Sequence, residues 1–163
     1  MARSRTVVLT EDVERSIFEQ LTDSLGKLSV PVHRPGETFD GSKHDVWCEP
    51  RIARYQRAGA TSRNGASSHP MTWTILVYRR VGSKGKEFGS LSAAVDTVRR
   101  LVDYSAGAPA MRVRNASREP VAAVQWGEAD EDRQHNISIT VQGVAHQGFD
   151  VATLTVVAQL TTT

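Results

Sequence analysis

The chain lacks the features that would place it among secreted or membrane proteins. Its only cysteine is Cys48, so no disulfide can form within it, and the disulfide framework of small secreted domains is excluded. No apolar run approaches the ~20 residues that cross a bilayer. Arg3 and Arg5 are followed by no apolar segment of signal-peptide type, so we expect neither a signal peptide nor a membrane partner.

A large net charge is also missing. Lys and Arg number 20 against 18 Asp and Glu, which leaves a formal charge of +2. Bulk charge therefore does not demand a nucleic-acid partner. With 163 residues, 39% of them hydrophobic, the chain is long enough to bury one core. We predict a single domain spanning residues 1–163.

Charge is nevertheless unevenly placed along the sequence. Residues 51–100 hold ten Lys or Arg and two Asp or Glu, a local net of +8, whereas 128–132 holds four acids in five residues. Such polarity can orient a protein against a copy of itself or another partner, although two solvated loops would give the same pattern. The charged residues that we assign to contacts between subunits or with another partner are Arg51, Arg54, Arg57, Arg63, Lys84, Lys86, Glu128, Asp130, Glu131 and Asp132.

Two amphipathic helices are predicted from apolar residues spaced three or four apart. The first covers 11–25 and ends at Gly26, with a stripe made by Val13, Ile17, Leu21 and Leu25. The second is capped by Ser90 or Ser92 and ends near Tyr104. Its apolar stripe is Leu91, Ala94, Val95, Val98, Leu101 and Val102.

Strands are predicted where apolar residues alternate or cluster. The strand at 45–52 should lie at a sheet edge or be bulged, because Pro50 has no N–H to donate. The strand at 71–81 has apolar residues on both faces and should be central. Further strands are expected at 111–114, 121–126, 137–141 and 151–160, with a turn at His146–Phe149 joining the last two. The small and polar residues at about 53–70 predict a long mobile loop.

This order of elements favours an α+β fold. Strands outnumber helices, and no regular alternation of strand and helix appears. We expect a mixed or antiparallel β-sheet with the two amphipathic helices packed on one face.

The usual chemical signatures are not met. Gly85-Lys86 is followed by Glu87 instead of Ser or Thr, so there is no P-loop. His44 and Cys48 would share a strand face, but two ligands do not make a closed zinc site. No Gly-x-Ser-x-Gly motif occurs. We therefore predict no catalytic residue, no cofactor and no metal, while a site assembled from distant residues stays open.

The layout resembles a known family. The elements that carry the resemblance are the opening helix Val13–Leu25, the segment Val30-Pro-Val-His-Arg-Pro35, the strands Val46–Ile52 and Thr72–Tyr78, and the helix Leu91–Tyr104 with strands after it. Over roughly residues 11–145 this pattern is similar to the tail terminator (tail completion) family of long-tailed bacteriophages and related phage-like particles. The chain departs from that pattern in its 53–70 insertion and in its strand at 151–160.

The resemblance implies a structural protein of the virion tail, assembled in the host cytoplasm, and not an enzyme. Such proteins form a hexameric ring on the end of the tail tube, where they stop tube polymerisation and join the head. The implied partners are further copies of the chain, the tail-tube protein, the head–tail connector or neck proteins, and DNA that passes through the channel without sequence-specific binding. A tail-tube or neck subunit, and a basic nucleic-acid-binding module, remain the alternatives.

Overall fold

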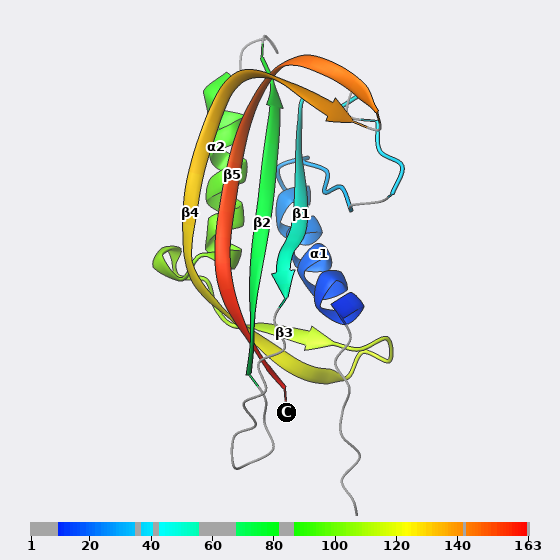
Figure 1. Ribbon diagram of the computed structural model, residues 1–163, viewed down its shortest axis with the longest axis vertical. Helices are drawn as coiled ribbons and strands as arrows, with labels where there is room; N and C mark the ends of the chain where they lie inside the picture. The colour runs from blue at the N-terminus through cyan, green and yellow to red at the C-terminus, as the bar shows by residue number, and fades with distance from the viewer. Residues whose placement is uncertain are drawn as a thin grey trace, which may run out of the picture.

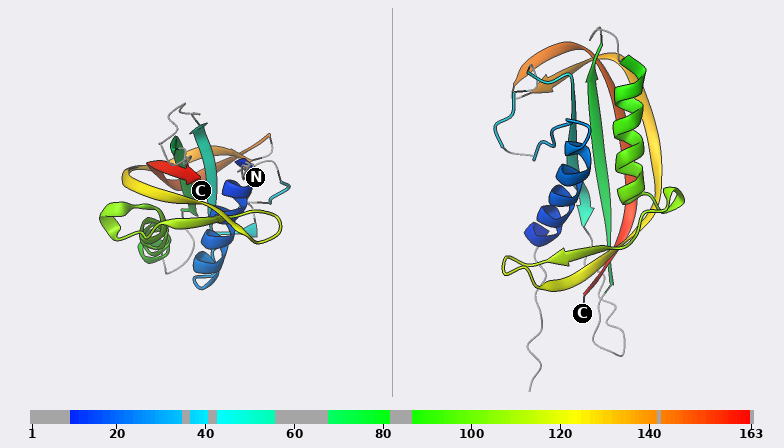
Figure 2. Two further views of the ribbon diagram at one scale, coloured as in Figure 1. Left: turned by 90° about the horizontal axis from the view of Figure 1, so that it is seen from below. Right: turned by 180° about the vertical axis from the view of Figure 1, so that it is seen from behind.

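The computed structural model describes residues 10–34, 37–40, 43–55, 68–81, 87–141 and 143–162. Five antiparallel strands form one sheet in the order β1-β2-β5-β4-β3, and both long helices lie on the same face of it (Figures 1 and 2). This confirms the α+β prediction. The elements are α1 Thr10–Gly26, β1 Val46–Tyr55, β2 Ser68–Arg80, α2 Glu87–Val102, η2 Tyr104–Ala106, β3 Met111–Arg114, β4 Pro120–Val141 and β5 Val144–Thr162.

Helix α1 forms as its periodicity predicts. Glu11 and Asp12 occupy the first turn, where carboxylates offset the positive end of the helix dipole. The apolar residues spaced four apart are buried and pack this face of the helix against the sheet. They are Val13, Ile17, Leu21 and Leu25. The helix ends at Gly26, and the carbonyl of Leu25 accepts hydrogen bonds from the N–H groups of Leu28 and Val30.

Strand β1 lies at an edge of the sheet, as Pro50 predicted, and its register with β2 shifts between Ile52 and Arg54. On its outer side only Cys48 is paired among the described residues. The N–H of Cys48 donates to the Pro31 carbonyl at 2.9 Å, and its carbonyl accepts from the His33 N–H at 2.7 Å. The segment before β1 thus runs beside the first half of the strand.

Strand β2 is central, as predicted, because β1 and β5 flank it. Met71, Trp73, Ile75 and Val77 are buried on the face that the helices cover, while the residues between them are partly exposed on the other face. The predicted loop is shorter at both ends than expected. Residues 53–55 belong to β1 and 68–70 to β2, whereas 56–67 lie outside the described residues.

Helix α2 begins earlier than predicted. It starts at Glu87, so neither Ser90 nor Ser92 is its cap. The helix ends at Val102, slightly before the expected Tyr104, because Asp103 adopts an extended conformation and caps the short helix η2.

The C-terminal half corrects two predictions. The expected strands at 121–126 and 137–141 are parts of one strand, β4, of 22 residues, and the acidic run lies within it. Strand β5 supplies hydrogen-bond partners along most of this length, and three register shifts absorb the irregularities. The chain reverses between Val141 and Val144, where Gly143 has φ 79°, whereas His146–Phe149 lies inside β5.

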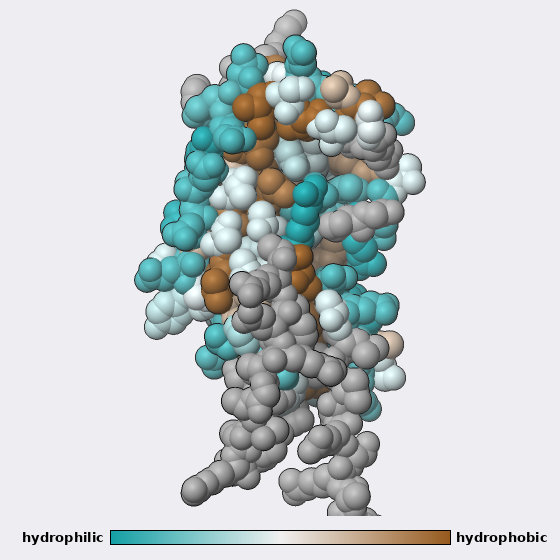
Figure 3. Space-filling view, viewed as in Figure 1, coloured by the Kyte–Doolittle hydropathy of each residue, from teal (hydrophilic) through white to brown (hydrophobic). Residues whose placement is uncertain are grey.

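The far ends of β4 and β5 curve over the open face of the sheet, the face without helices (Figure 1). They cover a small second core built on Trp47, Phe149 and Val151, apart from the main core between helices and sheet. A buried ion pair holds this end, with Arg79 Nη2 at 3.0 Å from Asp150 Oδ2. Figure 3 shows hydrophobic side chains gathered there and more polar ones over the middle of the sheet.

Candidate functional site

The acidic run lies on an exposed edge of the sheet. Strand β3 pairs with the first part of β4, from Pro120 to Val124. Beyond Val124 the outer edge of β4 has no neighbouring strand in the described part of the chain. Asp130 and Asp132 pair with Thr155 and Thr153 of β5, which places them on the open face. The four acids of the run are all exposed: Glu128, Asp130, Glu131 and Asp132.

Glu131 differs from its neighbours because it points toward the helices. It lies opposite the buried Leu154, and Arg133 Nε lies 3.3 Å from Glu131 Oε2. One acid of the run is therefore partly neutralised. Glu128, Asp130 and Asp132 carry the remaining negative charge of this strand edge.

Of the basic residues assigned to contacts, the structure describes the side chain of Arg51 alone. It is exposed on β1, at the opposite side of the sheet from β3 and the free edge of β4. Arg54 lies in β1, but the structure describes only its backbone. The acidic run and Arg51 therefore belong to one sheet, but β2 and β5 lie between the strands that carry them. The remaining assigned positions fall outside the described residues: Arg57, Arg63, Lys84 and Lys86.

Arg51 belongs to a polar cluster that the sequence did not predict. Its Nε and Nη2 donate to Glu49 Oε1 at 3.1 and 2.9 Å, and His33 Nδ1 lies 3.7 Å from the same oxygen. Glu49 is 8% exposed, and Tyr78 hydrogen-bonds to it. His33, Glu49 with Arg51, and Tyr78 come from three separate segments of the chain, so their spacing in the sequence does not predict the cluster.

The cluster borders a cavity of about 310 Å³ beneath the curved end of β4, where Ile139 and Thr140 contribute to its lining. Burial, followed by the charge of Glu49, raises the pKa of Tyr78 to about 12. The tyrosine therefore keeps its proton near neutral pH, and the carboxylate is neutralised by Arg51. We interpret the cluster as a hydrogen-bonded support that joins β1, β2 and the preceding segment.

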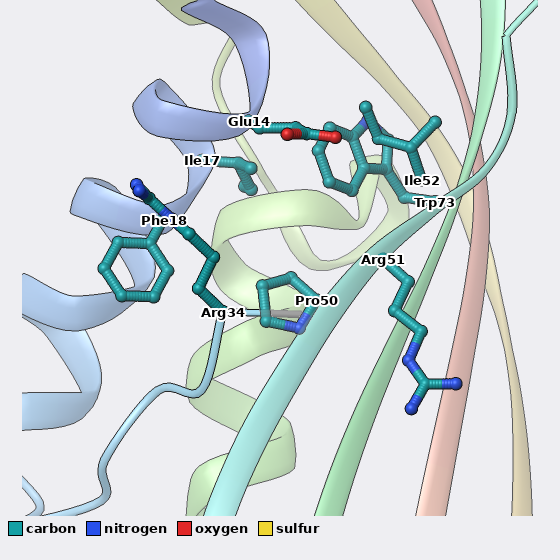
Figure 4. A pocket seen from close by; sticks show the side chains of 8 residues that line it. All are labelled: Glu14, Ile17, Phe18, Arg34, Pro50, Arg51, Ile52 and Trp73. Atoms are coloured by element: carbon teal, nitrogen blue, oxygen red, sulfur yellow. The ribbon is translucent and has the colours of Figure 1, made fainter. Parts of the chain in front are cut away.

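A second cavity, also about 310 Å³, is a groove between α1 and the edge strand β1 (Figure 4). Its walls are largely apolar and come from Ile17, Phe18, Pro50, Ile52 and Trp73. Its charged lining residues are Glu14, Arg34 and Arg51, and the Arg34 guanidinium carbon lies 4.6 Å from the centroid of the Phe18 ring.

The residues considered as metal ligands are separated by the sheet. Cys48 is fully buried in the main core, where burial raises its pKa well above the ordinary value and keeps it a neutral thiol. His44 stacks on Phe39 with ring centroids 5.2 Å apart. Within the described ranges, no three His, Cys, Asp or Glu side chains lie close enough together to hold a metal ion. Neither described helix is both long and apolar enough to cross a bilayer.

Comparisons with known proteins bear on the fold alone. No protein-family model and no curated protein matches the chain. It is similar to a solved structure whose name states no function, with a TM-score of 0.55 and 11% sequence identity over 94% of this chain and 96% of the other. The alignment covers nearly all of both chains, so the likeness extends to the whole arrangement of sheet and helices.

Proposed function

We propose that this chain is a structural subunit that assembles with copies of itself into a ring on the end of a phage-type tail tube. The ring ends tube polymerisation and presents a surface to the head connector, as the sequence resemblance implies. Six copies are expected from that resemblance. The proposal requires no cofactor and no catalytic residue.

The observation that carries the proposal is the placement of charge on the two sides of the sheet. The acidic run occupies the free edge of β4, and Arg54 lies on the edge strand at the opposite side, together with Arg51, whose guanidinium also pairs with Glu49. In a head-to-tail ring, each contact joins two different surfaces of the same protein. Opposite charges at opposite edges favour such a contact and disfavour pairing of like edges.

Reversal of the acidic run tests this arrangement. We expect the Asp130→Lys, Glu131→Lys, Asp132→Lys variant to lose rings and tube capping in negative-stain electron microscopy with tail tubes. The control is Glu11→Lys, Glu19→Lys, Asp23→Lys, which makes the same change in net charge at exposed positions of α1. Rings that persist in the first variant would contradict the proposed contact.

A compensating exchange makes the test more specific. Arg54→Glu with Arg57→Glu should also prevent ring closure, because two acidic surfaces would then meet. Combined in one chain with the reversed acidic run, these changes restore opposite charges, and rings should return. If the combined variant assembles no better than either parent, the two surfaces do not contact each other.

A further inference from the structure

The groove between α1 and β1 has the properties of a site for an extended peptide strand. Ile17 and Trp73 are each 1% exposed and form part of its apolar base. Phe18 and Ile52 are partly exposed beside them, so the groove remains open to solvent. Figure 4 shows Pro50 and Ile52 of the strand facing the helix residues across this space.

The adjoining strand edge also has backbone groups available for pairing. The N–H and carbonyl of Cys48 point away from β2, toward Pro31 and His33. Because these directions alternate along a strand, the carbonyl of Pro50 and both backbone groups of Ile52 point the same way. In the described part of the chain, no strand pairs with this edge beyond Cys48. An added strand would gain these hydrogen bonds and the apolar groove together.

We propose that the groove receives residues Thr6–Leu9 from a neighbouring copy of this chain. The sequence Thr-Val-Val-Leu is the apolar, strand-prone run that lies outside the described residues, and the other such segments are rich in Gly, Ser and charged residues.

Geometry favours exchange between copies over docking within one chain. The run ends at Leu9, directly before Thr10, where α1 begins. The groove starts at Glu14, four residues into the helix, or about 6 Å along its axis. To occupy it, the chain's own segment would have to reverse direction at once and run back along its own helix. A segment from another copy needs no such turn, and nine extended residues reach about 30 Å.

This inference rests on the self-association proposed above and adds a contact of a different kind. Charge on the sheet edges would orient neighbouring copies, while the exchanged segment would fasten them. Exchange also covers the exposed edge of β1, which would otherwise be open to non-specific strand pairing.

Disulfide trapping between two differently labelled chains tests the exchange. One chain carries a cysteine at position 6, 7, 8 or 9 in turn, such as Val8→Cys, and the other carries Ile52→Cys. Under oxidation we expect cross-linked heterodimers, strongest at alternate positions, because alternate side chains of a strand share a face. Cys48 is buried and does not compete. Val157→Cys, an exposed sheet position away from the groove, is the matched control and should give none.

Three results would overturn the inference. The first is no cross-link at any of the four positions. The second is an intramolecular cross-link alone in a chain carrying both cysteines, independent of dilution, since the groove would then hold its own segment. The third is equal trapping by Val157→Cys. If rings form but no cross-link is trapped, the exchange is wrong and the proposed function stands. If cross-links form but no rings are seen, the exchange stands and the proposed ring is wrong.

Discussion

Asp103 Oδ1 accepts a hydrogen bond from the backbone N–H of Ala129 at 3.1 Å. The contact joins the end of α2 to the point in β4 where the register shifts between Trp126 and Ala129. The same carboxylate accepts from the Ser105 N–H at 3.0 Å and from Arg99 Nε at 2.9 Å. One fully buried side chain therefore fixes a helix end, a turn and a bulged strand.

Removal of this carboxylate should destabilise the fold strongly. Asp103→Ala leaves the guanidinium of Arg99 and two backbone N–H groups without their acceptor, and we expect a loss of about 3 kcal/mol in the free energy of unfolding. Urea denaturation followed by circular dichroism measures it. Asp96→Ala, at an exposed position of the same helix, is the control and should change stability by less than about 0.5 kcal/mol. Equal effects of the two substitutions would show that Asp103 is not an anchor.

The same residue predicts a dependence of stability on pH. Burial alone would raise the Asp103 pKa, but hydrogen bonds from Ser105, Ala129 and Arg99 outweigh it and hold the pKa below its ordinary 3.8. The unfolded chain therefore takes up this proton at a higher pH than the folded chain does. The contribution to stability is complete at neutral pH and is lost as the pH falls below about 4.

Asp103→Asn isolates this contribution because it cannot titrate. The stability difference between the unmodified protein and the variant should shrink as urea denaturation is repeated from neutral pH down to about pH 3. A difference that stays constant over this range would assign the acid sensitivity to other carboxyl groups.

A substitution at Gly127 should strain the same bulge. A Cβ atom added there would lie 2.5 Å from the carbonyl oxygen of Val157, a backbone atom of the neighbouring strand, so β4 and β5 would have to separate locally. We expect Gly127→Ala to cost about 2 kcal/mol of unfolding free energy. Gly26→Ala meets no atom within 4 Å and serves as the control, with little effect or a small gain. Thermal unfolding of both variants would compare them, and a neutral Gly127→Ala would contradict the close approach.

Tyr78 should ionise late in an alkaline titration followed by tyrosinate absorbance. Its pKa of about 12 lies above the ordinary 10.0, mainly through burial and then through the charge of Glu49. The folded state thus binds this proton more tightly than the unfolded state, and stability should fall as pH rises from about 10 to about 12. Tyr78→Phe should abolish the late absorbance step.

Glu49→Gln provides the matched measurement for Tyr78. It removes the negative charge of Glu49 and leaves the burial of Tyr78 unchanged. The pKa of Tyr78 should therefore fall toward its ordinary value without reaching it. An unchanged titration in Glu49→Gln would show that the carboxylate does not act on the tyrosine.

The main helices and the central strand could be predicted because burial there follows a regular period. Val13 to Leu25 and Trp73 to Val77 alternate between core and solvent as an ideal helix or strand requires. The middle of β4 could not be predicted from the sequence. Its residues lie on an exposed edge, where polar side chains are tolerated and hydrogen bonds to β5 alone define the strand. The sequence of this segment does not show that β5, which follows the turn between Val141 and Val144, will pair with it.

The tight turn and the Glu49 cluster were hidden for related reasons. Gly143 and Gly148 both have positive φ, yet the first lies in the turn and the second within β5. A glycine signals the conformation without saying whether the chain reverses or bulges. His33, Glu49 and Tyr78 converge only once the sheet has formed, so no spacing along the chain announces them.

The position of β5 has a consequence for how the protein is made. It is the last of the five strands to leave the ribosome, and it lies between β2 and β4. Until it emerges, β1 with β2 and β3 with β4 can form only two separate ribbons, each with an exposed edge that will later be covered. The nascent chain must therefore keep these edges from pairing with other chains during most of its synthesis, and docking of β5 completes the sheet in a late step.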